Sequence, residues 1–368
     1  MRTLLSLTTA LTVATGGAFA DVPEIVTDTP VVHSLVSMVV GDLGTPEILL
    51  DAGSDPHAFQ LRPSQATSIQ NADLIFWIGE ELTPWLERAI DASSGDALSL
   101  ALLDAPGVHL IEFGEEADDD LHSDAEHDHD HGAEDKDHAE AEHDHDAEDE
   151  DHAEADHDHD HDAEDKDHAE AEHDHDAEGE DHAEAEHDHA HDHGGLDPHA
   201  WLDPDNALVW IDVIRNTLIS ADPDNAATYR LNAANAQNRV AEASQAAEVT
   251  LASVHDQSIV VFHDAYDYWA EAFDVSIVGS LALGDAADPG VRHLRELQEI
   301  VSEQDISCAF SEPQHNPSLA ESLANDAGIG LGVLDPSGTS LNFGADLYPQ
   351  LLTQLADATA ACVSAQSS

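Results

Sequence analysis

Lysine is almost absent from this chain, and positive charge of any kind is scarce. The 368 residues include 10 Lys and Arg against 79 Asp and Glu, which gives a formal net charge of −69. Both lysines, Lys136 and Lys166, lie in a low-complexity segment from 115 to 195. Nucleic acids and anionic lipid surfaces repel such a protein, and the ligand class that it attracts is a cation. An acidic coat suited to a saline habitat is an alternative interpretation of the same charge.

Long apolar runs are also missing. No run after residue 20 approaches the ~18 residues that a membrane span needs, so direct membrane insertion is not expected. Residues 1–20, MRTLLSLTTALTVATGGAFA, combine one Arg with a short apolar core and end in a small-x-small sequence. This pattern predicts a secretory signal that is cut near Ala20 and Asp21. The mature chain is therefore expected to be exported.

Cysteine is limited to Cys308 and Cys362. An even number of cysteines in an exported protein predicts one disulfide, with two buried free thiols as the alternative. The sequence has no HExxH motif and no pair of CxxC motifs. Motif spacing alone therefore identifies no metal site.

Composition divides the chain into residues 21–113, the segment 115–195 and residues 196–368. The middle segment repeats units such as AEDKDHAEAEHDHD and contains the 19 His that lie between His122 and His193. Stacked repeats need an apolar face, and Ala is the only apolar residue of these units. High charge without core-forming residues predicts a disordered insertion.

The flanking parts alternate short apolar runs with helical patterns, which is typical of parallel α/β sheets. Helices are predicted at Pro63–Asn71 and Val291–Gln304. The predicted strands are 24–28, 47–51, 73–79, 108–113, 258–263, 275–279, 306–312 and 330–335.

A long helix is predicted between the two α/β parts. It begins at Asp222 and Pro223 and then runs to Val254 without Gly or Pro. Small or apolar residues recur at three- and four-residue spacing and predict one apolar stripe: Tyr229, Ala233, Ala236, Val240, Ala243, Ala247, Leu251 and Val254. We interpret it as a rigid connection between two lobes, and a long core helix in one large domain is the alternative.

Three histidines outside the insertion occupy comparable places. His57 follows a predicted strand, His199 lies where the insertion ends, and His263 closes the strand SIVVFH. Asp335 ends another strand, GLGVLD. Ligands of open α/β sheets bind beyond the carboxyl ends of strands. Three imidazoles and one carboxylate are a suitable ligand set for Zn²⁺.

Six motifs together resemble one family. They are GSDPHAFQLRPSQ, NADLIFWIGEELTPWLE, DPHAWLDPDNA, FHDAYDYWAEAFDV, SEPQHNP and LGVLDPSG. The chain, apart from its repeat, is similar to the periplasmic zinc-binding component of bacterial ABC uptake systems, the ZnuA type. The resemblance implies two mostly parallel α/β lobes (21–222 and 255–368), one long rigid helix (223–254) and a metal site in the cleft between the lobes.

The resemblance also implies the site residues and the function. The expected ligands are His57, His199 and His263, and Asp335 aligns with the carboxylate that some relatives use. Nitrogen at His263 favours Zn²⁺ over Mn²⁺, since manganese-binding relatives tend to carry Glu there. Some zinc-binding members have Glu before the first ligand, whereas this chain has Pro56, so Asp335 and water are both candidates for the fourth position.

The protein is thus expected to be a periplasmic monomer that captures Zn²⁺ as its transported ligand, delivers it to an inner-membrane ABC permease and catalyses no reaction. The resemblance places a disulfide at Cys308 and Cys362 and an acidic insertion at 115–195. Three alternatives stay open: a manganese or ferrous-iron receptor, an exported zinc hydrolase and an exported zinc-buffering protein.

The insertion is predicted to collect zinc for a site built elsewhere. In an extended chain, His-x-His presents two imidazoles on the same side. Such a site must be ordered each time it binds, so it is weaker than a preformed cleft, but many of them raise the local ion concentration. The auxiliary positions are His127, His129, His131, His143, His145, His157, His159, His161, His173, His175, His187, His189, His191 and His193.

Overall fold

The computed structural model describes residues 22–113, 195–282 and 289–366. The predicted signal peptide and the auxiliary histidines of the insertion therefore lie outside the described residues. Among the residues that are described, no helix combines the length and the apolar composition that a membrane span requires.

The first lobe is built on a sheet of four parallel strands in the order β2-β1-β3-β4. All four residues of β3, the sequence LIFW, are buried, as expected of a strand that is covered on both faces. The strands are β1 (Ile25–Thr27), β2 (Glu47–Ile48), β3 (Leu74–Trp77) and β4 (Leu98–Ala101).

The strand predicted at 108–113 is wrong. This run forms only an isolated antiparallel bridge, between Glu112 and Leu196, and the fourth strand is β4 instead. β4 lies at the edge of the sheet, and Leu98 is 54% exposed. An edge strand needs no continuous apolar run, and for this reason the hydrophobic pattern did not single it out.

The second lobe contains the other parallel sheet, in the order β6-β5-β7-β8. The chain moves from β5 to β6 on one side and then crosses to β7 on the other side of β5. The neighbouring carboxyl ends of β5 and β7 are therefore a topological switch point, where ligands of such sheets bind. The strands are β5 (Ser258–His263), β6 (Ser276–Ala282), β7 (Ile306–Ser311) and β8 (Gly330–Val333).

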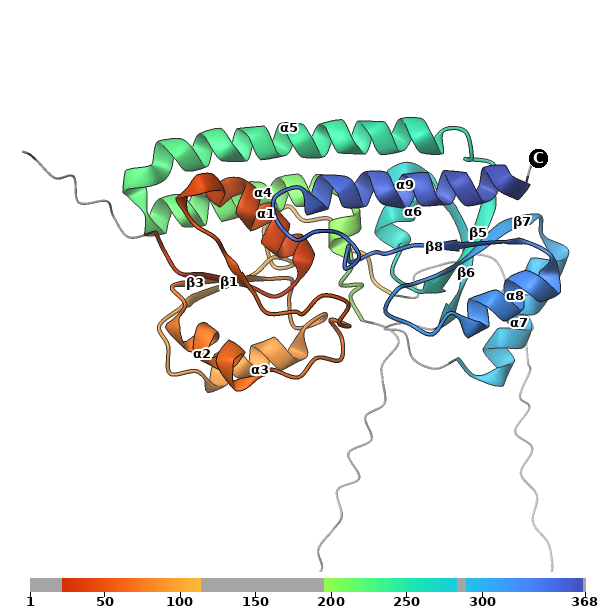
Figure 1. The fold of residues 1–368 in the computed structure, drawn as a ribbon, viewed down its shortest axis with the longest axis horizontal. Helices are drawn as coiled ribbons and strands as arrows, with labels where there is room; N and C mark the ends of the chain where they lie inside the picture. Colours follow the sequence, from red (N-terminus) through yellow and green to blue (C-terminus); the bar gives the residue numbers. More distant parts are fainter. Residues whose placement is uncertain (1–21, 114–194, 283–288, 367–368) are drawn as a thin grey trace, which may run out of the picture. The chain divides into compact units, whose positions relative to one another are not determined.

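Each sheet has its own outer layer of helices. The first sheet packs against α2 and α3 through one apolar cluster, and the second packs against α7 and α8 through another (Figure 1). These helices are α2 (Pro63–Asn71), α3 (Pro84–Ala92), α7 (Val291–Glu303) and α8 (Ser318–Ala327). The prediction of α2 was correct at both ends, and that of α7 was one residue too long.

The inner faces of both sheets share a single apolar core, which includes Ile25 of β1 and Ile259 of β5. Its helices include α1, whose eleven residues are all buried except Ser37, and α9, which lies alongside α5 (Figure 1). The helical elements of this layer and its connections are α1 (Pro30–Val40), η1 (Gly41–Leu43), η2 (Ala200–Leu202), α4 (Pro204–Ala221), η3 (Pro223–Asn225), α5 (Ala226–Leu251), α6 (Asp267–Phe273) and α9 (Leu347–Gln366).

The long helix of the prediction corresponds to α5, preceded by the short turn η3. The Asp222 side chain accepts a hydrogen bond from Asn225 N and another from the Tyr229 hydroxyl, which fixes the tight turn before α5. The predicted apolar stripe is confirmed, since all of its members are buried: Tyr229, Ala233, Ala236, Val240, Ala243, Ala247, Leu251 and Val254. Small residues on this stripe let α1, α4 and α9 approach the helix closely.

The two-lobed, parallel α/β architecture is therefore as predicted, and so is the disulfide, which joins Cys308 on β7 to Cys362 on α9. The boundaries at 222 and 254 and the rigidity of α5 stay predictions.

Candidate metal site

His57 and His199 lie in two copies of the same turn, Asp-Pro-His. The Asp55 carboxylate accepts a hydrogen bond from His57 N at 2.9 Å, and the Asp197 carboxylate accepts one from His199 N at 2.9 Å. An aspartate that binds the backbone two residues ahead forms an Asx turn, which fixes the direction of the following side chain. Local sequence therefore sets the backbone from which both imidazoles project.

His263 reaches the same place from the second sheet. It is the last residue of β5, and Glu312 follows the last residue of the neighbouring strand β7. The Glu312 Oε1 atom lies 2.9 Å from His263 Nδ1 and also accepts a hydrogen bond from the Tyr266 hydroxyl at 3.0 Å. The switch point of the second sheet thus holds one imidazole with a buried carboxylate behind it.

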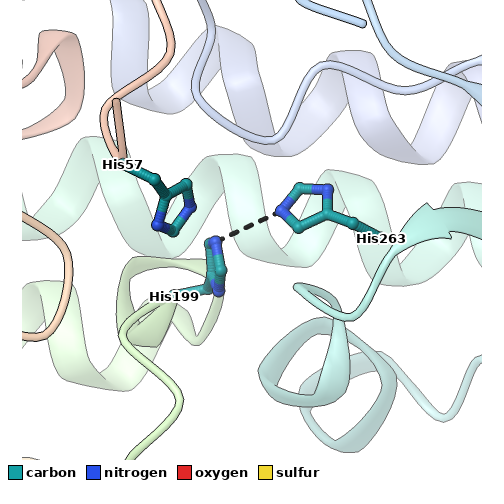
Figure 2. A group of neighbouring side chains, drawn as sticks. All are labelled: His57, His199 and His263. Atoms are coloured by element: carbon teal, nitrogen blue, oxygen red, sulfur yellow. Dashed lines mark hydrogen bonds between the residues drawn. The ribbon is translucent and has the colours of Figure 1, made fainter. Parts of the chain in front are cut away.

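The three imidazoles converge on one point (Figure 2). One ring nitrogen of each of His57, His199 and His263 lies within 4.8 Å of the other two. The Nε2 atoms of His199 and His263 are 3.4 Å apart. Two nitrogen ligands at ~2.0–2.1 Å from a tetrahedral zinc ion are roughly 3.4 Å apart, so this spacing is that of a ligand pair.

Carboxylates at Nδ1 orient the rings of His199 and His263 with their Nε2 atoms toward each other. The Nδ1 atom of His199 lies 2.7 Å from Asp197 Oδ1, as that of His263 lies against Glu312. A ring that donates Nδ1–H to a carboxylate carries its lone pair on Nε2. Two lone pairs that face each other across 3.4 Å form a site for a cation.

Burial shifts the pKa values of His199 and Asp197 in opposite directions. The pKa of His199 lies well below its ordinary value, because the ring is buried and His263 is nearby. Burial also raises the pKa of Asp197 to about 7. The Oδ2 atom of Asp197 is buried and has no hydrogen-bond partner, so it can hold a proton while Oδ1 still accepts from His199.

The pocket at this point is small. Its volume is about 10 Å³, the room that one water molecule or one ion needs. Trp201 packs next to the site, with its ring 5.2 Å from that of His199 and its indole N–H donating to Pro336 O. The lining residues are Asp55, Pro56, His57, His199, His263, Glu312, Gln314, His315, Pro336 and Ser337.

Asp335 is not grouped with the three histidines. It is 4% exposed, and its carboxylate accepts hydrogen bonds from the backbone N–H and the hydroxyl groups of Thr339 and Ser340 and from Gln314 Nε2. Both carboxylate oxygens thereby hold the turn after β8 together. The role of Asp335 as the fourth ligand stays a prediction.

The sequence reasoning missed three residues of this region: Asp197, Glu312 and His315. The repeated Asp-Pro-His was a usable signal for Asp197, and Glu312 was the last residue of a predicted strand beside the strand of His263. His315 lies outside the predicted ligand set, but it lines the pocket. Its position depends on how the turn after β7 folds, which no local pattern of the sequence indicates.

The zinc-uptake complex component A periplasmic (ZnuA) family model matches residues 25–362. The high-affinity zinc uptake system protein ZnuA of Paracoccus denitrificans is 45% identical over 362 residues, which cover 98% of each chain. The ZnuA proteins of Brucella suis and Haemophilus influenzae are 35% and 36% identical and cover 90% and 89% of this chain, and 89% of their own length in both cases.

Solved structures with similar folds are more distant in sequence. A manganese-bound periplasmic metal-binding protein of Candidatus Liberibacter asiaticus has a TM-score of 0.64 at 19% identity, and a crystal structure of ZnuA has 0.62 at 18%. Each match covers 92% of this chain and 99% of the other. At this identity the likeness concerns the fold alone. The match to the family model and the identities with its members together show that this chain belongs to the ZnuA family of periplasmic zinc-uptake components.

Proposed function

We propose that this chain is the zinc receptor of a bacterial ABC uptake system. It binds Zn²⁺ between His57, His199 and His263 in the periplasm and delivers the ion to a membrane permease. The observation that carries the proposal is the convergence of three imidazoles from separate parts of the fold on one ion-sized pocket. Relatives that are named as zinc uptake proteins over nearly the whole chain support it.

The donor set favours zinc over the alternatives in the same family. Imidazole nitrogens suit a borderline-soft ion, whereas Mn²⁺ prefers carboxylate and carbonyl oxygens. The two carboxylates closest to the rings, Asp197 and Glu312, are placed behind the Nδ1 atoms of their histidines. In that position they orient ligands and raise their basicity.

The size of the pocket favours a receptor over a zinc hydrolase. A hydrolase must place a substrate bond beside a metal-bound water. A volume of about 10 Å³ is filled by the ion itself or by one water. Capture and release of an ion is the chemistry that this space supports.

The insertion 115–195 is proposed to collect ions for this site. The described residues on its two sides are held together, with Phe113 N donating to Gly195 O at 2.8 Å and Asp197 N donating to Ile111 O at 2.9 Å. Gly195, the first residue described after Phe113, is two residues before Asp197 and four before the ligand His199. Ions that are held by histidines of the insertion would raise the concentration supplied to the pocket.

Zinc titration calorimetry with a competing chelator tests the proposal on two mature proteins. One has the full length, and the other lacks residues 115–194 but keeps the hydrogen bond to Gly195. We expect the shortened protein to retain one tight site and to lose only several weak ones. Loss of tight binding with the insertion would contradict the receptor and would favour the zinc-buffering alternative.

Zinc affinity should fall as the pH falls through 7. Burial raises the pKa of Asp197 to about 7 in the ion-free protein, and a cation beside His199 favours the ionised carboxylate. Zinc binding below pH 7 must therefore expel the Asp197 proton, whereas above pH 7 that proton has already left. We expect calorimetry at about pH 6 in buffers of different ionisation enthalpy to show up to one proton released by this residue per zinc ion.

Asp197→Asn is the matched variant for this measurement. It keeps an oxygen that accepts from His199 but has no proton to release. We expect weaker binding by about 10- to 100-fold, the usual effect of changing a residue that orients a metal ligand. Below pH 7 fewer protons should be released per zinc ion, because Asn cannot supply the proton that Asp197 releases. An unchanged number of released protons would show that another group supplies the proton.

A further inference from the structure

A second group of ligand atoms lies beside the three-histidine site. It consists of His263, Glu312 and His315, and one ligand atom of each lies within 4.8 Å of the other two. The Nε2 atom of His315 is 3.8 Å from Glu312 Oε2, the oxygen on the side away from the hydrogen bond to His263. Two imidazoles and a carboxylate are a ligand set that Zn²⁺ accepts.

His315 is held in place and is the more accessible end of this group. Its ring stacks on Phe262 with centroids 4.6 Å apart and planes inclined by 10°. Its side chain is 19% exposed, whereas those of His263 and Glu312 are 5% and 1% exposed. An ion that arrives from solvent can therefore meet His315 before it meets the buried members of the pocket.

The two groups share one ligand and one small space. His263 belongs to both, and a single pocket of about 10 Å³ is lined by all members of both. This volume has room for one ion, so occupation of the two groups is alternative rather than simultaneous. His57 and His199 are therefore within reach, across the same pocket, of an ion that leaves Glu312 and His315.

We propose that His263, Glu312 and His315 form an outer position that the cation occupies on its way into and out of the three-histidine site. This inference rests on the proposed function, because it assigns a route to the same ion. His315 lowers the barrier for entry and for release without being a ligand of the final site.

Stopped-flow kinetics on the full-length protein tests the route. His315→Phe removes the ligand nitrogens but keeps an aromatic ring for the stack on Phe262. Zinc association, and dissociation into excess chelator, are followed by tryptophan fluorescence, since the Trp201 ring lies against His199. His255→Phe is the control, because His255 is a partly exposed histidine that pairs with Asp274.

We expect both rate constants to fall together by about tenfold in His315→Phe, which corresponds to ~1.4 kcal/mol of added barrier. The dissociation constant, their ratio, should then stay within about threefold of the wild type. Unchanged rates would show that His315 only packs. Faster dissociation with normal association would make it a ligand of the final site, which also overturns the outer position. Failure of the proposed function is distinguishable, since wild type, control and variant would then all lack tight zinc binding.

An equilibrium measurement tests the outer position directly. The double variant His57→Ala/His199→Ala removes two ligands of the three-histidine site and leaves the outer group intact. The full-length chain is titrated with Co²⁺ with and without the additional change His315→Phe. The insertion contributes equally to both chains, so the difference between their absorption spectra reports the outer group. A signal that His315→Phe removes supports the position, and identical spectra overturn it.

Discussion

Replacing His199 by Ala is expected to weaken zinc binding by ~100- to 1,000-fold. Zinc sites built from about four protein ligands provide roughly 10–16 kcal/mol of binding free energy, so one ligand contributes ~2.5–4 kcal/mol. His199 is 2% exposed, faces His263 across 3.4 Å and has its tautomer fixed by Asp197. Its loss leaves the carboxylate without a ligand to orient and opens a cavity beside Trp201. Chelator competition on the protein without the insertion measures the change.

His293→Ala is a suitable control for this experiment. His293 lies on α7, and its Nε2 atom is 2.7 Å from the Ser280 carbonyl oxygen. We expect its zinc affinity to equal that of the wild type, while His57→Ala and His263→Ala should resemble His199→Ala. A tight site that survives all three ligand substitutions would contradict the assignment of the site.

Removing the disulfide is expected to cost about 4 kcal/mol of unfolding free energy. The bond joins residues 54 positions apart, and closing a loop of this length removes that amount of chain entropy from the unfolded state. Cys308 is buried on β7, and Cys362 lies on α9, the helix that runs beside α5 in the shared core. In Cys308→Ala/Cys362→Ala, we expect the melting temperature of the ion-free protein to fall by about 10 °C.

Reduction of the wild-type protein provides the matched comparison. Melting temperatures are measured by calorimetry with and without a thiol reductant. The reductant should lower the melting temperature of the wild type to that of the double variant and should not change that of the variant. Equal melting temperatures of the oxidised wild type and the variant would show that the bond constrains a part of the chain that is already structured when unfolded.

Much of the fold could be predicted from local patterns. The apolar stripe of α5 was predicted residue by residue, because one buried face of a helix repeats at a fixed period. The strands that are covered on both faces were found for a similar reason, since each is a continuous apolar run. β4 was missed because an exposed edge strand lacks such a run.

The residues of the candidate site could likewise be predicted only in part. Local sequence accounts for the Asp-Pro-His turns that hold His57 and His199 and for the position of His263 at the end of a strand, because these features depend on neighbouring residues. The carboxylate behind His263, in contrast, depends on the tertiary fold. The Asp335 carboxylate binds its own loop, whereas Glu312 and His315 line the pocket. Those positions are set by the pairing of β5 with β7 and by the fold of the turn after β7. His263 and Glu312 are 49 residues apart in the chain, and a contact over that separation produces no periodic pattern in the sequence.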